Sequence, residues 1–270
     1  RLMINKKYLK NLRSKEINSK NHFIFDLYSE RIIDSLEIIN LRFNKILILG
    51  NHGLKINEFI NKKYKDNSST IYDYKTNDFD PDEWQGEKEK YDLIISNFFL
   101  FLSDDIDNLF KKIITSLSPN GFFIATMPTK ENFNALKNAM IKTDMDLYGG
   151  AYNRFNKFID LEDIIKLLKK NNFKIPLVNF ETINLEYEKF TKLLNDVRSM
   201  KLSYYNDDKK QEFENRDYLK NLKKNYKKNL GNKYFISTNF YVISGWKNHK
   251  SQQRPMRPGQ AKNNLKDFLK

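Results

Sequence analysis

The sequence predicts an α/β fold in which a doubly wound, mostly parallel sheet carries helices on both faces. Two observations predict it. Short apolar runs that suit buried strands alternate with stretches of helical spacing, as in βαβ units. A glycine-containing turn, Gly50 to Gly53, follows the first run and leads into a helical stretch. The 270 residues are enough for one large domain or two small ones.

Each predicted strand is a short apolar run bounded by turn or polar residues, the pattern of a strand buried on both faces. The first run ends at Gly50, the second ends at Asp73, and a Ser-Pro-Asn-Gly turn precedes the fourth. In chain order, the predicted strands are 45–49, 70–72, 91–97, 121–126, 173–178 and 240–246.

Each predicted helix has an apolar residue at every third or fourth position. The clearest stripe follows Asp105 and runs to Leu117. The last helical stretch is mostly charged over 207–230, which suits a solvated cap over the sheet edge. In chain order, the predicted helices are 26–39, 54–64, 105–117, 131–141, 161–170 and 186–232.

The chain is basic, with a formal net charge of +14, and it contains no cysteine. An acidic partner is one interpretation of this charge. The lysines are spread along the chain, however, and Lys, Asn and Ile are all abundant, so an A/T-rich genome explains the charge better. Nucleic acid is therefore not the expected partner. The missing cysteines exclude disulfides, thiolate metal sites and a cysteine nucleophile.

The sequence also bears on the compartment. No apolar run reaches the roughly 18 residues of a membrane span, and the N-terminus lacks the apolar region of a secretory signal. We therefore expect a reducing, intracellular location. Because residue 1 is Arg, we expect a fragment or a processed product.

In open α/β sheets the ligand lies beyond the carboxyl ends of the strands. Here a glycine loop follows the first strand, an acid follows the second, and Asn97 ends the strand at 91–97. This order resembles the class I S-adenosylmethionine-dependent methyltransferases, in which the loop approaches the methionine part of the cofactor and the acid binds the ribose hydroxyls. The resemblance assigns cofactor binding to Gly50, Asn51, His52, Gly53, Asp73, Asn97 and Phe98.

A closer resemblance covers nearly the whole chain. The segment YDLIISNFFLFLSDDIDNLFKKIITSLSPNGFFIATMPT, at 91–129, and the pair Gly149-Gly150 followed by Phe158 and Asp163 are similar to motifs of one methyltransferase-like family. The segment GWKNHKSQQRPMRPGQAK, at 245–262, is similar to its motif GWxxHESQQKPLRPGSAK. This is the family of the complex I assembly factor 5 type, alphaproteobacterial and mitochondrial. The malonyl-carrier-protein methyltransferase of biotin synthesis resembles it more distantly.

The resemblance implies a Rossmann-like methyltransferase fold with an antiparallel last strand and a helical cap. The mitochondrial member is described as an arginine hydroxylase acting on an iron–sulfur subunit of NADH dehydrogenase. The expected division is an N-terminal helical segment, a methyltransferase-like core in two parts, a cap insertion and a basic tail, at 1–40, 41–185 with 234–246, 186–233 and 247–270.

Several positions depart from the family pattern. Ile48 replaces an acid of the cofactor loop, and His52 replaces a glycine. The interval between Asp73 and the next strand is about fifteen residues short, close to half a βαβ unit. We therefore expect the second helix or the third strand to be lost or reduced. The acid that contacts adenine is then Asp80 or Asp82, and the sequence does not decide between them.

Further candidates surround the substrate. The C-terminal motif is expected to line or close the pocket, and Arg198, in DVRSM, resembles an arginine of a family motif. His52 is either a donor to a ligand or a drifted position in an inactive loop. No metal site is predicted, since an iron site would need His52 to meet His249. The substrate-pocket candidates are Arg198, Trp246, His249, Ser251, Gln252 and Arg254.

Four functions stay open. The first is an S-adenosylmethionine-dependent methyltransferase-like protein that modifies or assembles a complex I subunit, in the bacterial cytoplasm or the mitochondrial matrix. The second is a non-catalytic assembly factor with a degenerate cofactor loop. The third is a carrier-protein or small-molecule methyltransferase, for which a basic surface would suit an acidic carrier. The fourth, suggested only by the charge, is an RNA methyltransferase.

Overall fold

The computed structural model describes residues 4–14, 23–50, 55–72, 79–208, 210, 214–226 and 232–252. Its strands are β1 (Lys45–Leu49), β2 (Ser68–Tyr72), β3 (Tyr91–Asn97), β4 (Leu117–Pro128), β5 (Phe173–Tyr187) and β6 (Tyr234–Lys247). Its helices are α1 (Lys6–Ser14), α2 (Phe23–Glu37), α3 (Lys55–Lys63), α4 (Ile106–Ser116), α5 (Asn134–Tyr148), α6 (Leu161–Lys170), α7 (Phe190–Ser199) and α8 (Tyr218–Asn225). No helix among the described residues is long and apolar enough to cross a bilayer.

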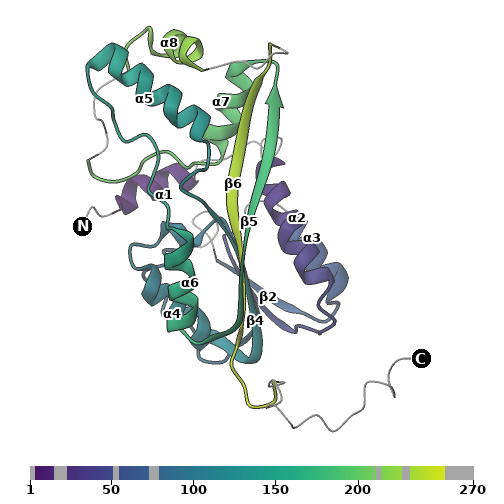
Figure 1. Cartoon of the computed structure of the whole chain (residues 1–270). Helices are drawn as coiled ribbons and strands as arrows, with labels where there is room; N and C mark the ends of the chain where they lie inside the picture. Colours follow the sequence, from purple (N-terminus) through teal and green to yellow (C-terminus); the bar gives the residue numbers. More distant parts are fainter. Residues whose placement is uncertain are drawn as a thin grey trace, which may run out of the picture.

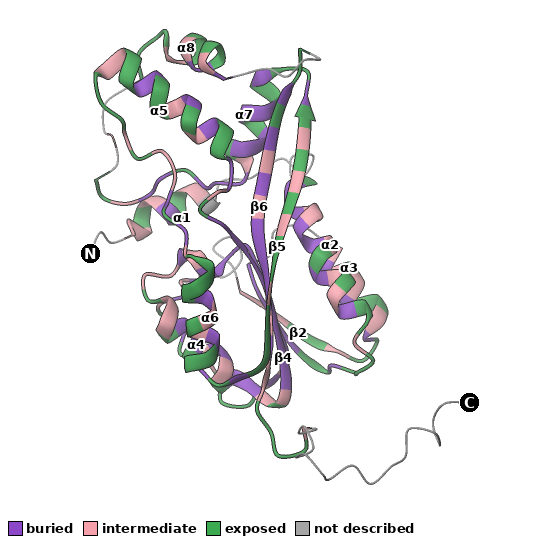
Figure 2. Ribbon diagram, in the orientation of Figure 1, coloured by how far each residue is buried: buried purple, intermediate pink, exposed green. Residues whose placement is uncertain are grey.

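The strands form one mixed sheet in the order β2-β1-β3-β4-β6-β5. The pairs β1–β2, β1–β3 and β3–β4 are parallel, and β6 runs antiparallel between β4 and β5. The predicted fold class, mostly parallel with an antiparallel last strand, is therefore confirmed. β5 is mostly exposed, as expected for an edge strand, whereas β6 is buried along much of its length (Figure 2).

Helices cover both faces of the sheet (Figure 1). α2 and α3 pack on one face and contribute to a core that includes Tyr28, Ile32 and Ile56. α4 and α6 pack on the other face and contribute Phe110 and Ile164 to a second core. The central strands β1, β3 and β4 are mostly buried because their runs are apolar at successive positions, as in parallel sheets generally.

The C-terminal part of β5 and the N-terminal part of β6 extend together beyond the rest of the sheet. Helices surround this extension at the top of Figure 1. We call α5, α7 and α8, with the segments 149–158 and 200–208, the upper lobe. α5 packs on α8, and α7 packs on β5 and β6. The boundaries predicted for the cap do not include α5, so the upper lobe draws on two separate parts of the chain.

Most predicted elements agree with the structure to within a few residues, but the continuous helix at 186–232 is wrong. α7 ends at Ser199, and residues 200–208 are not helical. Leu202, Tyr204 and Tyr205 of this segment are buried, and Ser203 bridges to Phe155. These tertiary contacts override the local helical spacing. α1 was not delimited as a separate helix, although residues 1–40 were expected to form a helical segment.

The expected loss in the interval after β2 is confirmed. Residues 79–90 contain neither a helix nor a strand, and β2 is the edge strand of the sheet formed by the described residues. In place of a helix, Phe79 and Trp84 cover the sheet on the α4 face, together with Leu9 of α1. Among the described residues, a short segment and α1 thus lie where the family pattern implies half a βαβ unit.

Candidate functional site

The parallel pairing brings the carboxyl ends of β1, β2 and β3 to one edge of the sheet. Leu49 lies opposite Tyr72 on one side and Ser96 on the other. Gly50, directly after β1, donates its N–H to the Tyr72 carbonyl at 2.8 Å. We call this edge the carboxyl edge; it is where ligands bind in open α/β sheets.

Gly50 can be no other residue without strain. Its φ is +78°, a conformation that side chains disfavour. A Cβ atom on Gly50 would also lie 2.6 Å from the Cβ of Phe99. The first glycine of the predicted cofactor loop thus keeps the geometry of a tight turn. The rest of that loop, Asn51, His52 and Gly53, and the predicted ribose acid Asp73 lie outside the described residues.

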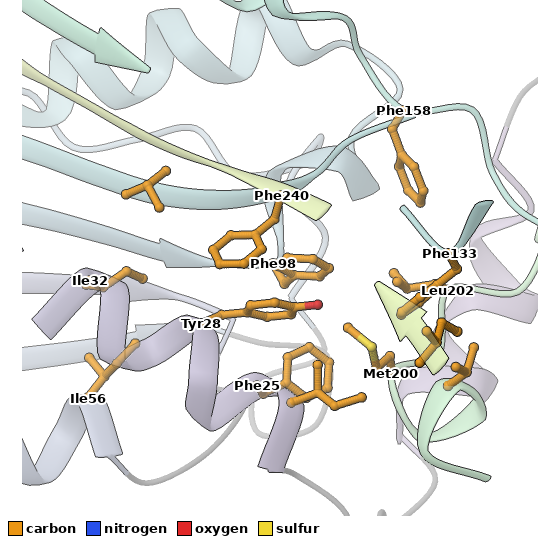
Figure 3. Packing of buried hydrophobic residues seen from close by; sticks show 14 of the residues in the cluster. Phe25, Tyr28, Ile32, Ile56, Phe98, Phe133, Phe158, Met200, Leu202 and Phe240 are labelled. Atoms are coloured by element: carbon orange, nitrogen blue, oxygen red, sulfur yellow. The ribbon is translucent and has the colours of Figure 1, made fainter. Parts of the chain in front are cut away.

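Asn97 and Phe98, also predicted to bind cofactor, are fully buried. The Asn97 side chain donates to the Ser29 hydroxyl at 3.0 Å and accepts from the Thr126 hydroxyl at 2.7 Å. The Phe98 ring stacks on Tyr28 of α2, with centroids 4.3 Å apart, as Figure 3 shows. These contacts fix the end of β3 beneath α2; a role in cofactor binding stays a prediction.

Asp80 and Asp82 are held by a lysine. Lys6 of α1 forms an ion pair with Asp80 at 2.9 Å and another with Asp82. Asp82 also accepts hydrogen bonds from the Ser103 hydroxyl and from the N–H of Asp104. Burial acts to raise the pKa of Asp82, but these donors outweigh it and hold the pKa below its ordinary value. We call this group the Lys6 clasp.

Beside the clasp, an aromatic ring lies over the end of β2. Phe79 stacks on Tyr72 with centroids 4.9 Å apart and planes 6° apart, and it lies 5.7 Å from the Phe99 ring. The described residues therefore fit S-adenosylmethionine only in part. Gly50 has a positive φ that suits a glycine of a cofactor loop, whereas Lys6 engages both Asp80 and Asp82, the two candidates for the acid that contacts adenine.

A cavity of about 420 Å³ opens inside the upper lobe, and Arg198, a predicted substrate residue, lines it. Its walls are apolar where α5, α7 and α8 face it and charged at Arg154, Lys210 and Glu214. The cavity is thus amphipathic, as small-ligand and side-chain pockets commonly are.

A network of ion pairs lies in the wall of this cavity. Arg154 bonds to Asp144, which is fully buried, and also to Glu214. Tyr148 donates its hydroxyl to Glu214 at 2.9 Å. Burial acts to raise the pKa of Glu214, but the hydrogen bonds outweigh it and lower the pKa to about 2. The network ties α5 to the segment before α8.

A second cavity, of about 380 Å³, lies beside α5 and is lined by Lys137, Phe155 and Phe158. The Phe158 ring lies 5.4 Å from Phe101, a position where the resembling family has a polar residue. Burial lowers the pKa of Lys137, and its ammonium lies 5.6 Å from both phenylalanine rings of the cavity. No sequence pattern singles out Lys137, which lies on a helix of ordinary spacing.

The C-terminal residues lie away from the carboxyl edge. Because β6 is antiparallel to β4, Trp246 pairs with Phe122 near the start of β4, and their rings are 4.4 Å apart. The side chains of His249 and Ser251 face Asn120, and Gln252 donates to the carbonyl of Lys247 at 2.8 Å.

These residues lie at the amino end of β4, at the edge of the sheet opposite Gly50. The structure thus places Trp246, His249, Ser251 and Gln252 away from Gly50, and their role in a substrate pocket stays a prediction. Arg254 lies outside the described residues. Within the described ranges, no cluster of ligating side chains could hold a metal ion.

The topology, with a glycine turn at the carboxyl edge, defines a methyltransferase fold. Residues 23–177 match the methyltransferase-domain family, and because this is more than half of the chain, the chain belongs to that family. A Bacillus halodurans structure described as a candidate methyltransferase has the same fold. It gives a TM-score of 0.51 at 8% identity and covers 81% of this chain and 98% of that one.

Proteins of known name are also similar to this chain in sequence. The mitochondrial arginine-hydroxylase NDUFAF5 of Dictyostelium discoideum is 28% identical over 67% of this chain, which spans only 42% of that protein. The protein of the same name from Danio rerio is 22% identical over 94% of this chain and 84% of its own length. The resemblance to this family inferred from the sequence motifs is thus confirmed.

Proposed function

We propose that this chain is a methyltransferase-fold protein that modifies or assembles a subunit of respiratory NADH dehydrogenase. The observation that carries the proposal is the similarity to proteins named arginine hydroxylase, which in the Danio rerio match extends over 94% of the chain. The upper-lobe cavity with Arg198 supports it, because it offers a pocket of a size suited to a client side chain. The bacterial cytoplasm or the mitochondrial matrix is the proposed compartment.

The proposed cofactor is S-adenosylmethionine, bound at the carboxyl edge. The positive φ of Gly50, directly after β1, supports it, since a glycine there lets the backbone approach a ligand closely. The cofactor would supply the group that is transferred. This chain's residues would hold it against the edge, where Asn97 and Phe98 fix the end of β3.

A specific observation favours a second candidate, an assembly factor without catalysis. Lys6 engages Asp80 and Asp82, the two candidates for the acid that contacts adenine, and Phe79 stacks over the end of β2. On this candidate the chain binds its client through the upper lobe and needs no cofactor.

Mass spectrometry of the NADH dehydrogenase subunits tests whether this protein is needed to modify one of them. Subunits from cells that lack this protein are compared with those from cells that carry it. The proposal expects one client residue to lose a covalent modification in the deletion strain. If every subunit keeps its modifications while the complex fails to assemble, the second candidate holds. If modification and assembly are both unchanged, the proposal is wrong.

A further inference from the structure

The cavity of about 380 Å³ beside α5 is lined mainly by cationic side chains and aromatic rings. It adjoins the upper-lobe cavity, because Arg154 and Phe155 line both. Its volume lies in the range of small-molecule pockets, about 300–1,000 Å³. Against a single acid, Asp160, its lining carries the cationic residues Lys130, Lys137, Arg154 and Lys157.

Two of these cations already have carboxylate partners. The Lys130 ammonium lies 2.9 Å from a carboxylate oxygen of Asp160, so the acid of the lining is engaged. Arg154 forms ion pairs with Asp144 and Glu214. The positive charge that remains at the cavity therefore comes from its two other lysines.

Lys137 is the half-buried cation among them. Its ammonium lies 5.6 Å from the ring centroids of both Phe155 and Phe158, so aromatic rings flank the charge. It donates to the carbonyl of Lys130 at 2.8 Å, which uses one of its three N–H bonds. It forms no ion pair with the described residues, and the charge of Glu131 acts on it only from farther away. Burial outweighs that charge and holds the pKa of Lys137 below its ordinary value.

This charge and its surroundings indicate the kind of ligand that fits. A half-buried ammonium is stabilised by an anion that accepts its N–H bonds, since such charge-assisted bonds are strong. Lys157 is exposed, so water and salt screen its charge. One ammonium balances one negative charge, which favours a carboxylate over a phosphate group with a charge of about −1.5 to −2. The phenylalanine rings and Ile141 offer contacts to an apolar body.

We propose that this cavity binds a small organic carboxylate with an aromatic or aliphatic body. The carboxylate accepts N–H bonds from the Lys137 ammonium, and the body packs against Phe155, Phe158 and Ile141. This ligand is neither the proposed cofactor nor a side chain of the proposed client, so the site does not depend on the proposed function.

Titration of the full chain with two small probes tests the site. Benzoate carries a carboxylate on an apolar ring, and benzamide has nearly the same shape without the charge. We expect saturable binding of benzoate at millimolar concentrations, with benzamide weaker by about tenfold or more. Calorimetry measures both, and benzoate should also raise the melting temperature. Equal binding of the two probes, or no saturable binding of benzoate at tens of millimolar, would overturn the proposal.

Two further probes identify the kind of anion. Phenyl phosphate carries a larger charge on the same ring, and N-acetyl-glutamate amide presents its carboxylate as a protein side chain does, without the ring. Both should bind more weakly than benzoate. Tighter binding of phenyl phosphate would assign the cavity to a phosphate group, and tighter binding of the glutamate probe would assign it to an acidic side chain of a partner protein. Either result would overturn the assignment to a small organic carboxylate.

Variants then locate the binding. Lys137→Met removes the charge but keeps a long apolar side chain, so it should fold and should weaken benzoate binding by about tenfold or more. Lys137→Arg keeps the charge and should retain most of the binding. Lys142→Met, an exposed position on the same helix outside the cavity, is the matched control and should bind like the parent chain.

Equal benzoate binding by Lys137→Met and the control would show that the carboxylate is held elsewhere, and the proposal would be wrong. Lys137→Gln provides the same test should the methionine variant fail to fold. The titrations need neither S-adenosylmethionine nor NADH dehydrogenase, so their outcome is independent of whether the proposed function holds.

Discussion

The carboxyl edge beside β2 and the upper lobe both pair their charged groups, but the pairs lie in different surroundings. At the edge, Lys6 engages Asp80 and Asp82, and residues 79–90 form neither a helix nor a strand. In the upper lobe, Arg154 pairs with Asp144 and Glu214 in the wall of a cavity of about 420 Å³. Buried polar groups that satisfy one another stabilise a fold, because an unpaired one costs free energy. The upper lobe thus combines a stabilising network with a cavity, whereas the candidate acids at the carboxyl edge are already engaged.

The largest expected loss of stability follows from a substitution in the upper lobe. Arg154→Ala leaves the fully buried carboxylate of Asp144 without its cation and should destabilise the protein by about 3–5 kcal/mol. Urea unfolding measures it. Lys166→Ala, which removes an exposed ion pair on α6, is the control and should cost only about 0–1 kcal/mol. Equal effects for the two variants would show that the network does not brace the lobe.

At the carboxyl edge, Gly50→Ala should cost about 2–4 kcal/mol, because the new Cβ meets Phe99 and the positive φ becomes strained. Two other glycines separate these causes. Gly149 has a φ of +70° with nothing within 4 Å, so Gly149→Ala should cost about 1–2 kcal/mol. Gly150→Ala meets neither obstacle and should leave stability unchanged. If Gly50→Ala costs no more than Gly149→Ala, Phe99 does not restrict the turn.

The Lys6 clasp should contribute about 1–2 kcal/mol near neutral pH, since it is partly exposed to solvent. Lys6→Met measures this contribution. The pKa of Asp82 is lowered in the folded protein, so the stabilisation is present above the unfolded pKa and is lost as the pH falls through the folded one. Unfolding of both proteins near neutral pH and below about pH 4 should therefore give a difference that shrinks in acid. A difference independent of pH would assign the effect to packing of α1.

The smallest expected effect is a gain in stability. The raised pKa of Asp196 means that its charged form opposes folding, and this cost grows as the pH rises through the unfolded pKa towards the folded one. Asp196→Asn should therefore stabilise the protein by about 1 kcal/mol at neutral pH and by nothing in acid, where both states carry the proton. Thermal melting across this range checks it. Destabilisation at neutral pH would mean that Asp196 serves the fold.

The sequence predicted the sheet well, because buried parallel strands are continuous apolar runs, as at β1 and β3. It also predicted the shortened interval after β2. It failed for residues 200–208, where helical spacing persists but packing against Phe155 prevents a helix. The features that the sequence did not predict are contacts between residues far apart in the chain. Nothing local shows that Lys6 reaches Asp82 or that Trp246 pairs with Phe122.

Calorimetric titration of S-adenosylmethionine into the full chain tests the proposed function most directly. Our account predicts saturable heat for one site per chain, together with a rise in the melting temperature. S-adenosylhomocysteine, which keeps the adenosine and amino-acid groups, should compete for the same site. Absence of heat and of thermal stabilisation at millimolar ligand would contradict cofactor binding and leave the chain a non-catalytic assembly factor.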